Sequence, residues 1–210
     1  MPKTKEEHVK YTRDEWLNNP LNYYKEIISY LKYKNILYIL DIGANVGETA
    51  NIFSEVFVNL KKSFLVEPNK ENYNFILKNT KNSISEVFNC AIGYYEEKMC
   101  LIPCPYGNVG GWKIGSLKNH MEFNEVPVKE LEELQIPIVD FVKMDVEGGE
   151  YNIIENSSYL KSVKFLEIEF HDMNINSKHF CEKHLQNHEI KIYQRYLETD
   201  NYNRVLLELK

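Results

Sequence analysis

Short apolar runs alternate with segments of helical spacing along most of the chain. Apolar runs of strand length lie at residues 36–40, 64–66, 87–92, 139–144 and 163–170. Helical spacing of apolar residues follows several of these runs, as in Ile52, Phe53 and Val56 after the first. This alternation predicts an α/β fold in which helices cover both faces of a mostly parallel sheet. Ligands then bind beyond the carboxyl ends of the strands.

The two ends of the chain depart from this alternation. Residues 1–12 are polar and are expected to be frayed, and residues 13–34 are expected to form a helical segment. Two further strands, 191–197 and 205–209, are separated by a short turn and should therefore be antiparallel. Ser177 is predicted to cap the helix that precedes them.

Residues 94–137 interrupt the regular pattern and are expected to hold short strands and turns. Glycines cluster around Trp112, which suits an irregular surface loop. Tyr106 and Trp112 could stack on a sugar face or pack into a small core of the loop itself. The whole chain, residues 1–210, is expected to form one domain in which this insertion and the N-terminal helix shape the acceptor pocket.

Composition narrows the class of protein. The 210 residues include 25 basic and 31 acidic side chains, so the formal charge of −6 offers no attraction to phosphate backbones or anionic lipid. Four cysteines are too few for a disulfide scaffold. The chain has no run of about 18 apolar residues, and its first ten residues lack the apolar centre of a signal peptide. These features predict a soluble, cytoplasmic protein whose partner is neither nucleic acid nor membrane, and they leave its oligomeric state open.

The turn after the first predicted strand has the composition of a ligand-binding loop. It carries Gly43, Asn45 and Gly47, and glycine lets the backbone approach a ligand while asparagine tolerates left-handed conformations. The spacing differs from the GxGxxG pattern of dinucleotide sites, so an ordinary turn is the alternative. Glu67 ends the next strand, where a carboxylate can accept hydrogen bonds from both ribose hydroxyls. The loop and the acid together favour a nucleoside ligand.

Four segments resemble one protein family. They are DIGANVG at 41–47, VEPN at 66–69, FNCAIG at 88–93 and FVKMDVEGGE at 141–150, and they resemble the FkbM family of S-adenosylmethionine-dependent methyltransferases. Residues 129–131 depart from the acidic TLD-like turn that the family often carries. The resemblance implies the class I methyltransferase fold, a seven-stranded, mostly parallel sheet with an antiparallel C-terminal strand pair. It also implies methylation, commonly of hydroxyl groups on sugars or secondary metabolites.

The resemblance further implies a binding site for S-adenosylmethionine. Carried over by position, Asp41, Gly43, Asn45 and Gly47 would surround the methionine end of the cofactor. Glu67 would hold its ribose, and Asn89, Cys90 and Ala91 would lie near its adenine. Asp145 would also contact the cofactor, at its ammonium group.

Acidic residues and a histidine end the fourth and fifth predicted strands. Asp145 follows the fourth strand, and Glu169 and His171 alternate at the end of the fifth, so all three are catalytic candidates. A hydroxyl acceptor needs orientation and a base, a role predicted for His171, with a structural histidine as the alternative. Glu150 could contact a ligand or cap a helix. The site is expected to be metal-free, although a divalent ion held by Asp145, Glu147, Glu169 and His171 is an alternative that is not favoured.

The favoured function is O-methylation of a saccharide, a sugar nucleotide or a related small polar metabolite. RNA 2′-O-methylation is the closest alternative, because Lys143 or Lys164 could join Asp145 and Glu169, but the net charge opposes it. A non-catalytic subunit that binds S-adenosylmethionine would keep the same cofactor residues. A nucleotide-dependent oxidoreductase is disfavoured because the dinucleotide pattern is absent.

Overall fold

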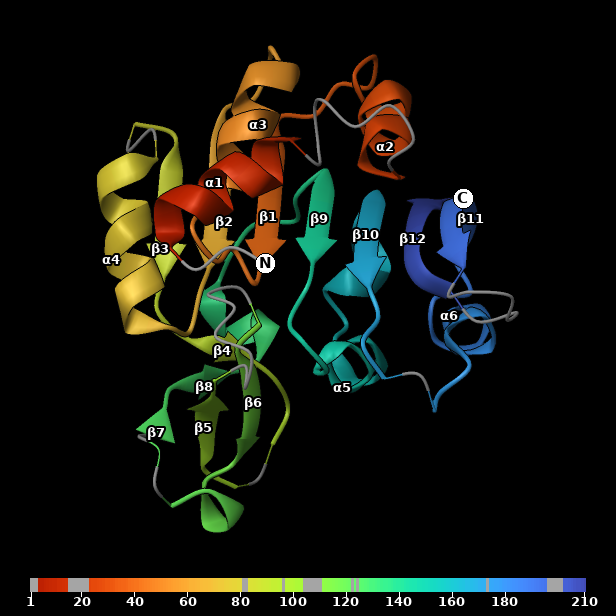
Figure 1. The fold of residues 1–210 in the computed structure, drawn as a ribbon. Helices are drawn as coiled ribbons and strands as arrows, with labels where there is room; N and C mark the ends of the chain where they lie inside the picture. The colour runs from red at the N-terminus through yellow and green to blue at the C-terminus, as the bar shows by residue number, and fades with distance from the viewer. Residues whose placement is uncertain are drawn as a thin grey trace.

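A seven-stranded sheet forms the centre of the protein (Figure 1). The computed structural model describes residues 4–14, 23–80, 83–95, 97–103, 111–121, 123, 125–172, 174–195 and 202–210. From edge to edge the strands are β11 (His188–Arg195), β12 (Tyr202–Leu209), β10 (Phe165–Glu169), β9 (Phe141–Met144), β1 (Tyr38–Ile42), β2 (Lys62–Val66) and β3 (Ser85–Phe88). β12 runs antiparallel to β10 and β11, and the other pairings are parallel. The predicted fold class is thereby confirmed, including the antiparallel pair near the C-terminus.

Helices cover both faces of this sheet. On one face, α2 (Tyr23–Leu31) and α3 (Glu48–Val56) pack against Phe141 and Phe165. On the other face, α5 (Glu150–Asn156) and α6 (Ser177–His184) pack against Val142 and Leu166. Ile76 of α4 (Lys70–Asn79) packs against Leu65 of β2. The central strands are therefore buried on both sides, which explains why they read as continuous apolar runs.

Residues 94–137 supply short strands and turns, as predicted, and these lie beyond the carboxyl ends of the strands of the main sheet (Figure 1). β5 (Met99–Ile102) pairs antiparallel with β6 (Lys113–Ser116) and β7 (Glu125–Val126), and β4 (Ala91–Ile92) pairs parallel with β8 (Val128–Lys129). Three short 3-10 helices complete the described elements: η2 (Leu117–Asn119), η3 (Leu131–Leu134) and η4 (Leu160–Ser162). Tyr106 lies outside the described residues.

The strand predicted over residues 87–92 is in fact divided into β3 and β4, which belong to different sheets. The side-chain amide of Asn89 donates hydrogen bonds to the backbone oxygens of Glu67 and Pro68, over 2.9 and 3.0 Å. These bonds hold the chain at the end of β2 and interrupt the strand. Cys90 and Ala91 are thereby placed beside Glu67.

The N-terminal segment is helical, so the expectation of frayed residues 1–12 is wrong for most of them. Helix α1 (Lys5–Arg13) begins with a capping box between Thr4 and Glu7. Arg13 then binds α3, because its Nε donates to Glu48 Oε1 over 2.7 Å and its other nitrogens bind Glu55. α1 has no buried side chain among its residues. Polar contacts therefore hold this helix, and an apolar pattern could not reveal it.

The cap of α6 differs from the prediction by one residue. Asn176 accepts the hydrogen bond from the backbone amide of His179, over 2.9 Å. The Ser177 hydroxyl instead donates to the backbone oxygen of Tyr202, over 2.7 Å, and ties α6 to β12.

In the part of the chain that the structure describes, we find no helix with the length and apolarity needed to cross a bilayer.

Candidate active site

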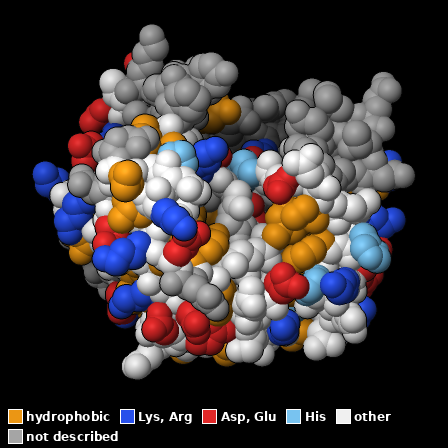
Figure 2. Space-filling model, turned by 90° about the horizontal axis from the view of Figure 1, so that it is seen from below, with side chains coloured by type: hydrophobic (Ala, Val, Ile, Leu, Met, Phe, Trp, Pro, Cys, Tyr) orange, Lys and Arg blue, Asp and Glu red, His pale blue; other side chains and the backbone are white. Residues whose placement is uncertain are grey.

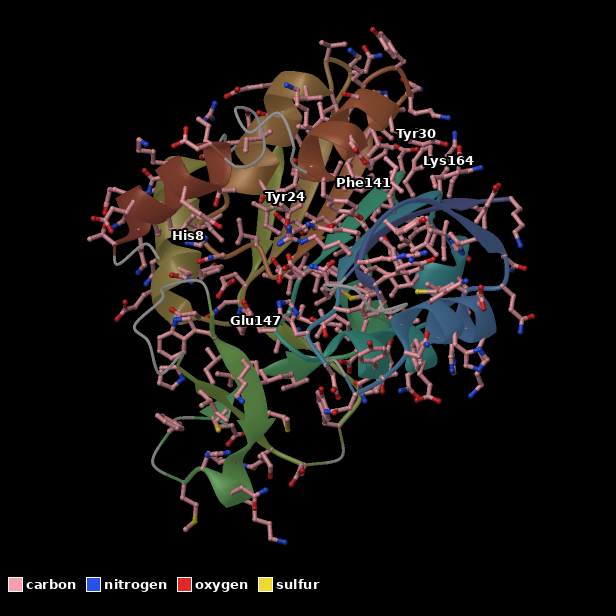
Figure 3. The ribbon with its side chains drawn as sticks, turned by 45° about the vertical axis from the view of Figure 1, so that its right-hand side comes forward. His8, Tyr24, Tyr30, Phe141, Glu147 and Lys164 are labelled. Atoms are coloured by element: carbon pink, nitrogen blue, oxygen red, sulfur yellow. The ribbon has the colours of Figure 1, made fainter. Side chains whose placement is uncertain are left out.

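A cavity of about 300 Å³ lies at the carboxyl ends of β1, β2, β9 and β10. Helix α1 contributes His8, Tyr11 and Thr12 to its wall, and Trp112 contributes from the residues before β6. In Figure 3, His8, Tyr24 and Glu147 approach this region from three separate parts of the chain. The volume falls within the range of small-molecule sites.

The glycine loop after β1 forms one wall of the cavity. Gly43 has φ of 84°, and a Cβ on it would collide with the backbone oxygen of Asp145, so only glycine fits. Asn45 adopts the predicted left-handed conformation, with φ of 51°. Its side-chain oxygen accepts a hydrogen bond from Asn72 over 3.0 Å, and its amide nitrogen lies 2.7 Å from His8 Nε2. The loop is thus fixed by contacts to both α4 and α1.

Glu67 is held rigidly at the end of β2. One carboxylate oxygen accepts from the backbone amide of Asn45 and the other from that of Asn69, each over 2.8 Å. Each oxygen keeps a lone pair that can accept a further hydrogen bond. Burial, only partly offset by these bonds, raises the pKa of Glu67 to about 7.

Three of the predicted cofactor residues support the cavity wall from behind and do not line it. Asp41 is fully buried. Gly47, with φ of 77°, packs against Thr80 and Ile76, and Asn89 anchors the end of β2. The remaining predicted cofactor residues line the cavity: Gly43, Asn45, Glu67, Cys90, Ala91 and Asp145.

Lys143 joins the floor of the cavity to a row of buried charges. Its ammonium nitrogen lies 3.2 Å from Asp145 Oδ2 and 3.7 Å from Asp41 Oδ1. The strand register places Asp41, Lys143 and Glu167 side by side on β1, β9 and β10. Burial alone would lower the pKa of Lys143, but the carboxylates of Asp145 and Asp41 raise it, so the lysine stays charged.

Both carboxylate oxygens of Glu169 are bound by neighbouring side chains. Its Oε1 accepts from Arg204 Nη2 over 2.6 Å, and its Oε2 accepts from the Tyr24 hydroxyl over 3.2 Å. Arg204 stands opposite Glu169 in the antiparallel register of β10 and β12. Both Tyr24 and Arg204 line the cavity, although no sequence pattern predicted them as site residues.

His171 lies at the centre of a group of carboxylates. Its Nδ1 lies 2.8 Å from Glu150 Oε1, and its Nε2 lies 3.7 Å from Asp145 Oδ1, 3.5 Å from Glu147 Oε2 and 4.0 Å from Glu169 Oε1. All the catalytic candidates, Asp145, Glu169 and His171, are therefore brought together. Glu150, which could have been a cap or a ligand contact, bonds His171 and also accepts from the backbone amide of Gly148 over 3.1 Å.

The charge state of this group differs from the expectation for His171. Burial favours neutral imidazole, but the bond to Glu150 and the charge of Asp145 outweigh it and raise the pKa of His171 to about 10. Burial raises the pKa of Glu147 to about 7. Burial also disfavours the charged form of Asp145, yet Lys143 and His171 lower its pKa. In this arrangement His171 is an imidazolium at neutral pH, so it has no free lone pair with which to act as a base.

The two lysines considered for an RNA-modifying site lie in different places. Lys143 reaches Asp145, whereas Lys164 precedes β10 and stacks over Phe165, with its ammonium 5.3 Å from the ring centre. Figure 3 shows Lys164 near Tyr30, far from Glu147. Because Glu169 ends the same strand, β10 separates Lys164 from the cavity by about 16 Å.

The architecture and the strand-end site together define the class I methyltransferase fold, which S-adenosylmethionine-dependent methyltransferases share. The model of the methyltransferase FkbM domain matches residues 41–206. The chain therefore belongs to the FkbM methyltransferase domain family, as the resemblance indicated.

Solved structures support the assignment of the fold. The methyltransferase FkbM from Methylobacillus flagellatus KT superposes with a TM-score of 0.58 at 14% identity, over 98% of this chain and 50% of that one. M. capricolum TrmK, in complex with S-adenosyl-homocysteine, gives 0.52 at 15% identity, over 91% and 70%. An rRNA methylase from Streptococcus thermophilus gives 0.52 at 11% identity, over 92% and 98%. The chain thus spans about half the length of the FkbM structure. A search of curated proteins found no significant match.

Proposed function

We propose that the protein transfers a methyl group from S-adenosylmethionine to a hydroxyl group of a saccharide, a sugar nucleotide or a related small polar metabolite. The observation that carries the proposal is the position of Glu67, held by two backbone amides at the edge of a cavity and directly beside the Gly43 loop. The carboxylate of Glu67 suits a ribose diol, and the neighbouring glycine loop lets another part of the same ligand approach the backbone closely.

The lining residues fit the parts of S-adenosylmethionine in order. Glu67 would hold the ribose, and Cys90 and Ala91 would contact the adenine. The loop at Gly43 and Asn45 would receive the methionine end. When bound, the cofactor supplies an electrophilic methyl group, which leaves the sulfonium sulfur as the bond to the acceptor oxygen forms. Asp145, which lines the same cavity, would lie near the positively charged end of the cofactor.

The other end of the cavity fits a polar acceptor. Asp145, Glu147, Glu169 and His171 present charged groups that can orient hydroxyls, and Trp112 offers an aromatic face of the kind that stacks on sugar rings. An acceptor hydroxyl has to lose its proton during transfer. A carboxylate of this group would take that proton, because the imidazolium of His171 can only donate hydrogen bonds.

RNA 2′-O-methylation is less well supported. Lys143 lies beside Asp145, as this alternative allows, whereas Lys164 lies at the far end of β10 from Glu169. The formal charge of −6 opposes the binding of RNA. Figure 2 looks onto the end of the molecule where the strands finish, and on its described part basic side chains are interspersed with acidic ones. A strong, salt-sensitive affinity for RNA near physiological salt would revive this alternative.

Mass spectrometry tests the proposal directly. Purified protein and S-adenosylmethionine are incubated with polar metabolites and with glycans, and the expected product is heavier than its acceptor by one methylene group. Binding of S-adenosylhomocysteine without any methylated product in such libraries would favour the non-catalytic subunit instead. Absence of binding would contradict the proposed function.

A further inference from the structure

We infer that Asp145, Glu147 and His171 form a binding site for one divalent cation at the acceptor end of the cavity. The inference deepens the proposed function, on which the role of the cation in methyl transfer rests. It revises the expectation of a metal-free site and rests on the positions of four side chains.

The three side chains offer ligand atoms at suitable separations. One atom of each, from Asp145, Glu147 and His171, lies within 4.8 Å of the others. His171 Nε2 is 3.7 Å from Asp145 Oδ1 and 3.5 Å from Glu147 Oε2. An ion about 2.1 Å from each ligand atom keeps those atoms about 3.0 Å apart in octahedral geometry and about 3.4 Å apart in tetrahedral geometry. Small rotations of the side chains would close the remaining gaps.

A buried carboxylate outside this set points to the same site. Glu150 is fully buried, and its Oε1 lies 2.8 Å from His171 Nδ1. Its Oε2 has no hydrogen-bond partner among the described residues. A carboxylate on the far nitrogen of a histidine is the usual support of a metal-binding imidazole, because it fixes the ring and directs the other nitrogen at the ion. Glu150 directs His171 Nε2 toward Asp145 and Glu147 in this way. A cation bound there would displace the proton from Nε2 to solvent, because a metal-binding imidazole is neutral.

The neighbouring cations leave the site open to an ion. Lys143 engages Oδ2 of Asp145, so Oδ1 remains directed at His171. Arg204 and Tyr24 occupy both oxygens of Glu169, which is therefore outside the ligand set. Within the described part of the chain, His171 is the only ion-pair partner of Glu147. The Glu147 carboxylate is thus free to bind a cation.

The ligands also indicate the kind of ion and its use. Carboxylates suit Mg²⁺ and Mn²⁺, and imidazole suits transition metals, so Mn²⁺ matches the whole set. The side chains of the three ligands are 25–34% exposed, which leaves coordination positions for acceptor oxygens. A bound acceptor hydroxyl would then lose its proton to solvent more easily, and its oxygen would form the new bond to the methyl carbon.

The test is a titration of Mn²⁺ into the purified full chain, with free Mn²⁺ measured by electron paramagnetic resonance. The wild type should bind one Mn²⁺ per chain. Glu147→Gln and His171→Gln should each weaken binding at least about tenfold, and Glu150→Gln should weaken it about 10- to 100-fold through the orientation of His171. Glu155→Gln changes an exposed carboxylate of the same helix as Glu150 and should leave binding unchanged.

Two results would overturn the inference. One is the absence of Mn²⁺ binding in wild-type protein whose circular dichroism shows that it is folded. The other is equal affinity in the wild type, Glu147→Gln and His171→Gln, which would mean adventitious binding. Calorimetry with S-adenosylhomocysteine on the same samples tests the proposed function separately. If the protein binds Mn²⁺ but not S-adenosylhomocysteine, the proposed function is contradicted and the cation site is still supported.

Discussion

Lys143 Nζ lies 3.2 Å from Asp145 Oδ2, although only 6% of the lysine side chain is exposed. The pair links the core of the sheet to the cavity, because Lys143 also stands beside the buried Asp41 on the neighbouring strand. Charges buried at this depth are stable only when they compensate one another. The buried Asp41 and the cavity-lining Asp145 therefore share one buried cation.

Replacing Lys143 by methionine should destabilise the protein strongly. Lys143→Met keeps much of the side-chain volume but leaves Asp41 and Asp145 without their buried counter-charge. We expect the free energy of unfolding to fall by about 3–5 kcal/mol in urea denaturation at pH 7. Lys164→Met is the matched control, since it removes an exposed lysine next to the adjacent strand and should change stability by less than about 0.5 kcal/mol. Equal stability of both variants would show that the buried pair contributes little.

Glu67→Ala should weaken S-adenosylhomocysteine binding by roughly 1.5 to 3 kcal/mol, because charged hydrogen bonds to the ribose would be lost. Calorimetry measures this change and compares it with Glu71→Ala, which truncates an exposed acid in the first turn of α4. The wild type should also prefer S-adenosylhomocysteine to NAD. Tighter binding of NAD would contradict the assigned cofactor.

Binding of S-adenosylhomocysteine should depend on pH through the same residue. Burial raises the pKa of Glu67 to about 7, so the carboxyl is partly protonated at neutral pH in the free protein. A carboxylate that accepts from ribose hydroxyls favours the ionised form, so affinity should fall as the pH decreases from 8 to 6. We expect a decrease approaching tenfold per pH unit well below 7. Calorimetry over this range measures the slope, and a flat profile would exclude Glu67 as the titrating acceptor.

Glu167 should make the protein less stable in alkaline solution. Burial raises the pKa of its fully buried carboxyl to about 8, despite Lys143, and neither oxygen has a hydrogen-bond partner among the described residues. Since the folded-state pKa exceeds the unfolded value, the stabilising contribution is complete below about pH 4.5 and is lost as the pH rises through 8. Glu167→Gln should therefore be more stable than the wild type at pH 9, by about 1–3 kcal/mol, and by less at pH 6. Urea denaturation measures the difference in stability between Glu167→Gln and the wild type at each pH. The same difference at pH 6 and pH 9 would contradict this prediction.

The sequence was sufficient to predict the strand-end residues of the site. Gly43, Asn45 and Glu67 follow short apolar runs, and the rule that parallel strands end at one edge brings them beside Asp145 and His171. Each of these inferences depends on local pattern and chain direction. Such information is present in a single sequence.

Other parts of the site depend on long-range pairing that local patterns do not encode. Arg204 meets Glu169 only because β12 inserts beside β10 in one particular register. His8 reaches Asn45 only because Arg13 holds α1 on α3. The capping pattern of Thr4 and Glu7 could have revealed the start of α1, but not its position. The protonated state of His171 likewise arises from carboxylates on separate segments.

We expect His171 to be needed for methyl transfer but not for cofactor binding. His171→Ala should reduce turnover on the identified acceptor by about 10²-fold or more while changing S-adenosylhomocysteine affinity far less, because His171 holds the acceptor-end carboxylates in position. Asp145→Asn should have a similar effect on turnover, but it also disturbs Lys143 and is the less specific probe. His179→Ala is the control, since it removes an exposed histidine of α6. Steady-state kinetics with calorimetry on the same preparations separates the two effects. Unchanged turnover in His171→Ala would remove this histidine from the mechanism and leave methyl transfer to positioning by the carboxylates alone.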